Sequence, residues 1–183
     1  WGVNDYGQLG DGSTTNQRYP VLVAGGHAWA VIAPGNEHTC GITTDGVGLC
    51  WGRDDSGQLG NGTGQQSSLV PDTIAGGRAW TEMATGDLTT CGITDAGDAY
   101  CWGYNTDYQT GSGSTASTEE TPVLVVGGHT WQTLGAGRRH FCAVTPDHVA
   151  YCWGRGAGGA LGTGWVTTSA EPVRVAEPTP YEP

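Results

Sequence analysis

Short apolar runs alternate with glycine-rich and polar segments along the whole chain. Residues 29–33, 38–43 and 48–52 form three such runs, and a tight turn at 44–47 joins the last two, because Asp-Gly readily adopts positive φ. A long polar stretch, 53–69, leads to a fourth short run near 70–74. Runs of this length bounded by Gly and Pro are typical of β-strands. The pattern therefore predicts four short antiparallel strands in about 50 residues.

This pattern recurs along the chain. Trp-Gly occurs at Trp1, Trp51, Trp102 and Trp153, at intervals of 50, 51 and 51 residues. Each Trp-Gly is followed by GQLG or a variant of it and by a Pro, and three of the units continue with Gly-Gly, a second Trp and two cysteines. A repeat of this length indicates one supersecondary unit that must stack on its neighbours to bury its faces.

The repeated phrases resemble the regulator of chromosome condensation repeat, over residues 1 to about 175. The resemblance rests on WG, GQLG, the Pro, the Gly-Gly and a Gly-x-x-His entry into a strand, and the third unit departs from it at 108–110. It implies a β-propeller of four-stranded blades, usually about seven of them. We therefore expect an all-β fold, a β-propeller-type array of four-stranded antiparallel blades with about 51 residues per repeat.

The blade phase of that family divides the chain into three parts. Residues 1–28 form a partial repeat with a leading outer strand near 20–23, residues 29–175 form three blades, and residues 176–183 form a Pro-rich C-terminal tail. Three blades cannot close a propeller of the usual size, and their end faces would expose apolar surface. We expect a longer parent chain or self-association to cover those faces.

Two rows of tryptophan recur in phase, and we predict that both pack between blades. The rows are Trp29, Trp80 and Trp131, and Trp51, Trp102 and Trp153.

The six cysteines form three pairs, each ten residues apart and symmetric about a turn. Facing positions of a hairpin have Cβ atoms within roughly 5 Å, which is close to disulfide range. Zinc binding and free buried thiols are the competing interpretations, but three pairs in phase favour disulfides and an oxidising compartment. The predicted bonds are Cys40–Cys50, Cys91–Cys101 and Cys142–Cys152.

The charge composition disfavours two classes of binding partner. The formal net charge is −11, and the seven basic residues are spread thinly along the sequence without a visible patch. This balance disfavours nucleic acid and acidic membranes, because both are bound through clustered Lys and Arg. No stretch approaches the roughly 20 apolar residues of a membrane-spanning helix. We therefore expect neither nucleic-acid binding nor membrane insertion.

No catalytic pattern stands out. His38 and His140 share one repeat position, where Thr89 stands in the middle unit, and in the resembling family this position usually makes a structural hydrogen bond. The adjacent carboxylates Asp54 and Asp55 lie in a loop and single out no acid–base pair. There is no nucleophile elbow, phosphate loop or EF-hand, although calcium in an acidic loop stays open. We expect a non-enzyme without a cofactor.

The polar loops 11–18, 61–68 and 112–120 vary from unit to unit, as a binding surface would. Asn61-Gly62-Thr63 matches the N-glycosylation acceptor pattern. The leading hypothesis is an extracellular or cell-surface structural, adhesive repeat protein that self-assembles, as a filament for example, or belongs to a larger propeller. The alternative is a secreted, inhibitor-like module that binds a protein through its rim loops. Tyr6, Tyr104, Tyr108 and Trp165 are the aromatic residues available for such a rim.

Overall fold

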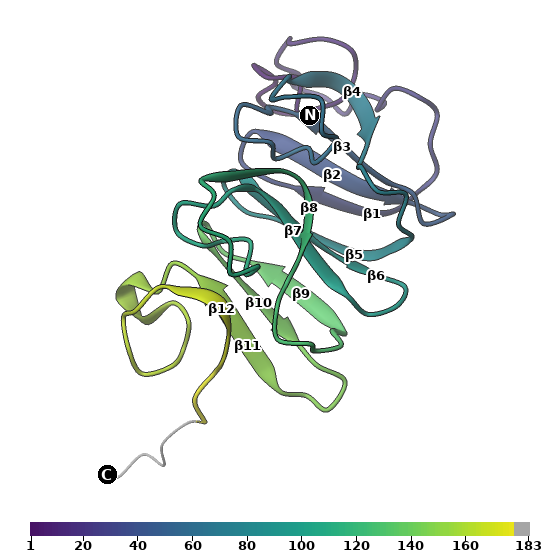
Figure 1. The fold of residues 1–183 in the computed structure, drawn as a ribbon. Coiled ribbons are helices and arrows are strands. Elements are labelled where there is room, and N and C mark those ends of the chain that lie inside the picture. Colours follow the sequence, from purple (N-terminus) through teal and green to yellow (C-terminus); the bar gives the residue numbers. More distant parts are fainter. Residues whose placement is uncertain (178–183) are drawn as a thin grey trace.

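Three four-stranded antiparallel sheets follow one another along the chain in a computed structural model that describes residues 1–177 (Figure 1). The predicted tail at 176–183 lies mostly outside the described residues. The first sheet contains β1 (Trp29–Pro34), β2 (His38–Thr43), β3 (Gly48–Gly52) and β4 (Ser68–Thr73). The second contains β5 (Trp80–Thr85), β6 (Thr89–Thr94), β7 (Ala99–Tyr104) and β8 (Thr118–Leu124). The third contains β9 (Thr133–Ala136), β10 (His140–Val144), β11 (Ala150–Gly154) and β12 (Ser169–Arg174), with a short 3-10 turn at Ala157–Gly159.

Each sheet is a meander in which consecutive strands pair, and the first strand of each sheet contacts the first strand of the next. The sheets are therefore arranged as successive blades with β1, β5 and β9 innermost. The all-β fold and its four-stranded antiparallel sheets agree with the sequence prediction. The array is open, because the third sheet does not return to the first (Figure 1).

The expected outer strand near residues 20–23 is not formed. In the first blade the outer strand β4 pairs with β3, whose last two residues, Trp51 and Gly52, correspond to Trp1 and Gly2. Only an isolated bridge between Gly2 and Gln17 remains of that pairing. No strand within residues 1–177 pairs with residues 20–23, and this segment is an irregular connection.

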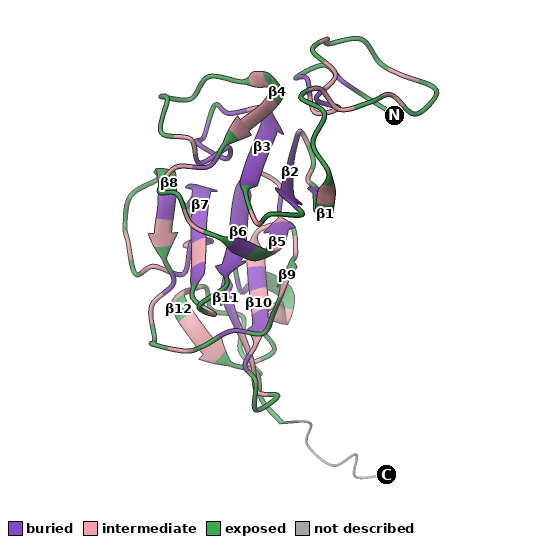
Figure 2. Ribbon diagram, turned by 90° about the vertical axis from the view of Figure 1, so that its right-hand side faces the viewer, coloured by how far each residue is buried: buried purple, intermediate pink, exposed green. Residues whose placement is uncertain are grey.

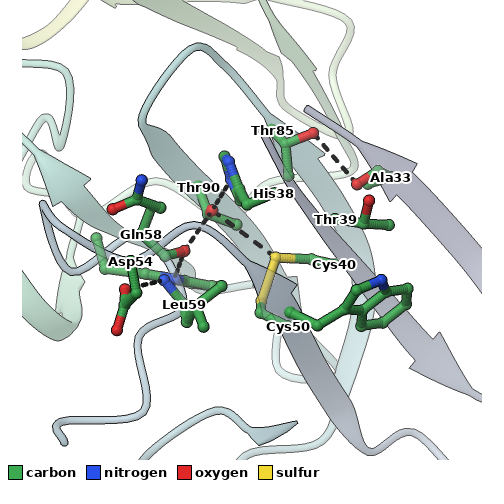
Figure 3. The surroundings of a disulfide bond; sticks show 12 residues. Ala33, His38, Thr39, Cys40, Cys50, Asp54, Gln58, Leu59, Thr85 and Thr90 are labelled. Carbon is green, nitrogen blue, oxygen red and sulfur yellow. Dashed lines mark hydrogen bonds between the residues drawn. A yellow bond between two sulfur atoms is a disulfide. The ribbon is translucent and has the colours of Figure 1, made fainter. Parts of the chain in front are cut away.

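All six cysteines are paired as the hairpin symmetry predicts. Cys40 faces Cys50 in the β2–β3 register, and the two other pairs occupy the same places in their sheets. Each pair is bonded, with a Cα–Cα distance of 4.0 Å. Figure 3 shows the first disulfide beside residues of the second blade.

The core lies between the blades. One cluster combines the Cys40–Cys50 disulfide and Ile42 of the first blade with Trp80 and Trp102 of the second. The next combines Cys91–Cys101 with Trp131, Phe141 and Trp153 in the same way. Figure 2 shows that burial follows the middle strands β2, β3, β6 and β7, whereas the outer strands β4, β8 and β12 are mostly half-buried or exposed.

Trp29 differs from its repeat equivalents. Trp80 and Trp131 are both 3% exposed, whereas Trp29 is half-buried, because residues 1–28 form no sheet that packs against it. Trp51 is nevertheless buried, since residues 1–28 supply the loop that covers it, and its Nε1 donates a hydrogen bond to the Gln8 carbonyl at 3.0 Å.

We predict that Trp80→Ala lowers the free energy of unfolding by about 3–5 kcal/mol, the usual cost of truncating a fully buried aromatic side chain. Trp29→Ala is the matched control at the same repeat position, and its smaller burial predicts a clearly smaller loss. Urea unfolding followed by tryptophan fluorescence and far-UV circular dichroism measures both. Equal losses in the two variants would contradict the inter-blade packing of Trp80.

Candidate functional site

The long loops of the three blades lie on one side of the array, and the β2–β3, β6–β7 and β10–β11 turns lie on the other (Figure 1). Residues 53–67, 105–117 and 155–168 connect the third and fourth strands of their sheets. These loops, the N-terminal loop 3–16 and the short turns at 35–37, 86–88 and 137–139 make up what we call the loop rim. Of the variable polar segments 11–18, 61–68 and 112–120, residues 11–16, 61–67 and 112–117 belong to it.

Repeated hydrogen bonds fix the base of each loop. The side-chain oxygen of Asn4, Asp54 or Asn105 accepts from the backbone amide five residues later, at 2.8–3.0 Å. The Nε1 groups of Trp102 and Trp153 donate to the carbonyls of Gln58 and Gln109 at 3.0 Å.

The final Gly of the GQLG phrase is required at this place. Gly60 has a φ of +67°, and a Cβ there would lie 2.5 Å from Trp102 Nε1. The motif that repeats along the sequence therefore anchors the loops and leaves their tips free to vary.

Aromatic and arginine side chains gather on the loop rim. The Arg53 guanidinium lies over the Tyr6 ring, 5.0 Å from its centroid. Arg53 also forms ion pairs with Glu37 and Asp55. The aromatic residues of the rim loops are Tyr6, Tyr108 and Trp165, and Tyr104 ends β7 next to them in the sequence; Trp165 is 73% exposed.

Two further ion pairs cross from the second blade to the third. Arg138 Nε donates to Asp87 at 2.6 Å, and Arg139 donates to Asp107 at 3.2 Å. With Arg53 and Arg155, four of the seven basic residues lie on this rim. The expectation that basic residues form no patch was wrong, because the turn 137–139 lies beside the residue that follows β11 in the same blade, and Arg138, Arg139 and Arg155 line one hollow.

Family-model matches cover most of the chain. The regulator of chromosome condensation (RCC1) repeat matches residues 1–42, 45–93 and 96–144, and a second model of that repeat matches 80–109. The chain belongs to the RCC1 repeat family.

Relatives and solved structures carry the same repeat or fold. The chain is 31% identical to the human E3 ubiquitin-protein ligase HERC2 over 96% of its own length and 4% of HERC2. It is 32% identical to the ultraviolet-B receptor UVR8 of Arabidopsis thaliana, over 90% of the chain and 38% of UVR8. Its fold is similar to human WBSCR16, with a TM-score of 0.82, 20% identity, and coverage of 94% and 46%.

Yeast RCC1 (Prp20), solved bound to Kap60, matches with a TM-score of 0.81 and 22% identity over 97% of the chain and 44% of that protein. The chain thus spans less than half of each of these proteins.

The shared histidine position of these RCC1 repeats is structural in the first blade. His38 is fully buried, and its Nε2 lies 2.9 Å from the Thr90 hydroxyl of the second blade (Figure 3). Burial lowers the pKa of the His38 imidazole to about 4, so the ring is neutral at physiological pH. His140 is half-buried, and burial lowers its pKa as well.

The structure gives no clustered metal ligands in residues 1–177, where no group of three or more His, Cys, Asp or Glu side chains could hold an ion. No helix of that part is long and apolar enough to cross a bilayer.

Asn61 of the predicted glycosylation site lies on the loop rim. Its amide donates to Asp72 at 2.7 Å, and the Thr63 hydroxyl donates to its side-chain oxygen at 2.9 Å.

Asp54 departs from the other repeats in a way that sequence analysis missed. In the equivalent place Asn105 donates through Nδ2 to the carbonyls of Ser114 and Ala116, at 3.2 and 3.0 Å. A carboxylate cannot donate, and Oδ2 of buried Asp54 has no hydrogen-bond partner. Burial raises the pKa of the Asp54 carboxyl to about 6. An alignment of the repeats on their Trp-Gly pairs places Asp54 in register with Asn4 and Asn105, and the change from amide to carboxylate would have marked this position.

We predict that Asp54→Asn stabilises the chain at pH 7 by about 1–3 kcal/mol, the usual cost of an unsatisfied buried polar group. The folded pKa of Asp54 lies above its ordinary value of 3.8, so its protonated form stabilises the fold below that value. This stabilisation is lost as the pH rises from about 4 to about 6, and the advantage of the variant should grow over the same interval.

Urea unfolding at a series of pH values measures this advantage. Asn105→Asp is the reverse substitution at the same repeat position and should lose stability over the same interval. No gain for Asp54→Asn at pH 7 would contradict the assignment.

Proposed function

We propose that this chain is a non-catalytic protein-binding module whose contact surface is the loop rim. The observation that carries the proposal is the position of four aromatic and four arginine residues in or next to the loops of one rim of an acidic molecule. Tyr, Trp and Arg are the residue types that dominate the energetics of protein interfaces. The loops that present them are anchored at their base and vary at their tips, which suits recognition.

The relatives support a binding role without naming a partner for this chain. Prp20p from Saccharomyces cerevisiae has binding properties toward Gsp1p and histones, and a second solved structure contains it bound to Kap60. These proteins have the fold in common with the chain, which supports the propeller surface as a scaffold for protein binding. The ligase activity in the name of HERC2 is not carried over, because the chain matches 4% of that protein.

We place the module outside the cell or at its surface. Three buried disulfides in one chain are typical of an oxidising compartment, and each contributes about 2–3 kcal/mol by constraining the unfolded chain. Because the blades carry little apolar bulk, this contribution supports folding there. The Asn61 acceptor is compatible with the same compartment.

A structural or adhesive role through self-association is the second candidate, and the open face of the first blade favours it. This end face contains a hollow of about 340 Å³ lined by Trp1, Val21, Trp29, Ile32 and Trp51 among others. Trp1 is 74% exposed and Ile32 is 46% exposed. Apolar surface of this kind is usually covered by protein, in this case by a further blade or a second copy.

Capture of proteins from the extracellular fraction of the source organism tests the rim. Immobilised wild-type chain should retain a partner that the double variant Tyr6→Ala, Trp165→Ala loses, because these side chains supply exposed aromatic contact area. Leu124→Ser on the outer strand β8, away from the rim, is the control and should retain the partner. Loss in the control, or retention by the rim variant, would contradict the rim as the contact surface.

Isolation from the source with thiols blocked tests the compartment and the assembly. Intact-mass measurement should show six cysteines without blocking groups, and light scattering should give a particle larger than the 18.9 kDa chain. Blocked, free cysteines in native material would exclude the extracellular assignment. A monodisperse particle of one chain would exclude self-association and leave the rim proposal untouched.

A further inference from the structure

The loop rim ends in an arginine pocket at the third blade. Arg138, Arg139, His140, Arg155, Ala157 and Ala160 line a hollow of about 310 Å³. Arg138 is 78% exposed and Arg139 is 37% exposed at the side chain, and Arg155 is also exposed. Three of the seven basic residues of a chain with a net charge of −11 thus lie around one opening.

The first blade carries different charges at the equivalent positions. In the first blade the Arg53 amide donates to the Glu37 carbonyl at 2.9 Å, and in the third blade the Arg155 amide donates to the Arg139 carbonyl at 2.9 Å. Arg155 is therefore the structural equivalent of Arg53, and Arg139 that of Glu37.

The carboxylates that neutralise Arg53 are both replaced in the third blade. Arg53 forms ion pairs with Glu37 and Asp55. Their equivalents are Arg139, which adds a positive charge, and Ala157, which has none. Among the described residues no carboxylate lies within ion-pair distance of Arg155.

The preceding joint shows what fits against such a pocket. A similar hollow between the second and third blades is lined by Asp87, Leu88, Tyr104, Gln109, Arg138 and Arg139. There the second blade presents Asp87 and Asp107, and the third blade binds them with Arg138 and Arg139. At the end of the third blade the polarity is reversed, because arginines stand where the second blade has Asp87 and Leu88.

We propose that the pocket formed by Arg138, Arg139, His140 and Arg155 binds an acidic segment of a protein partner, with its carboxylates paired to Arg155 and Arg139. The proposal rests on the loop rim as a protein-binding surface and names the chemistry of the partner. Arginine pairs with carboxylates through two parallel hydrogen bonds, which gives such a contact direction as well as strength. Tyr104, which lines the adjoining hollow together with Arg138 and Arg139, gives apolar area beside the charges.

Fluorescence anisotropy with a labelled synthetic peptide tests the pocket. The peptide carries four glutamates separated by glycines, and its counterpart carries glutamine in their place. The acidic peptide should bind the wild-type chain, and Arg155→Ala and Arg139→Ala should each weaken binding about tenfold. The glutamine peptide should not bind, and salt at about 0.5 M should weaken the acidic peptide strongly.

Arg78→Ala is the control with the same change of net charge. Arg78 lies in the connection between β4 and β5, over the Tyr100 ring at 4.1 Å, and should leave peptide affinity within twofold of wild type. Arg155→Glu adds a second direction, because it should favour a lysine peptide of the same length over the glutamate one. Thermal unfolding of each variant checks that the fold is kept.

Three results would overturn the proposal. Equal weakening by Arg78→Ala would show that the peptide responds to net charge alone. Binding of inorganic phosphate or of a single-stranded oligonucleotide as tight as that of the peptide would show a general anion site. Absence of peptide binding would reject the acidic partner, while loss of the captured protein from Tyr6→Ala, Trp165→Ala but not from Arg155→Ala would leave the rim as the contact surface.

Discussion

The packing of one blade's tryptophans against the disulfide-bonded hairpin of the preceding blade holds this array together. A four-stranded sheet of about 50 residues has two faces and too little bulk to bury either alone. Trp80 and Trp102 lie in one cluster with Cys40–Cys50, and Trp131 and Trp153 lie in the next with Cys91–Cys101. Because each cluster draws residues from two blades, no blade is a folding unit by itself, and every end of the array leaves half a cluster without its partner.

Because the core lies between the sheets, the loops can vary in composition. The hydrogen bonds that tie a loop to the array come from its first residues, as with Asn105 to Thr110 and Trp153 to Gln109. The rest of each loop makes few obligatory contacts, so its composition can change without affecting the core. Asp54 marks a limit of that freedom, since a carboxylate replaced an amide inside the anchor and left an oxygen without a partner.

The sequence predicted the repeat, the strands and the disulfides because these features depend on local spacing. A Cys pair ten residues apart around a turn fixes a hairpin register, and Trp-Gly every 51 residues or so fixes the blade. The outer strand near 20–23 was predicted and is absent, since a strand depends on a neighbour that local pattern does not supply. The arginine pocket was missed for a related reason. Arg139 and Arg155 are 16 positions apart, and their proximity follows only from placing them on the Glu37–Arg53 pair of the first repeat.

Net charge and local charge have opposite sign on this molecule, and the contrast has a consequence for recognition. A surface with an excess of 11 negative charges repels acidic proteins over distances of about a Debye length, roughly 8 Å at physiological salt. The proposed acidic segment would meet less repulsion where Arg138, Arg139 and Arg155 outnumber Asp87 and Asp107. Repulsion between like charges on the rest of the surface disfavours other orientations of the proposed acidic segment, and the arginines of the pocket would attract it in one orientation. One arginine without a carboxylate partner therefore contributes more to the orientation of an acidic partner on this acidic surface than it would on a neutral one.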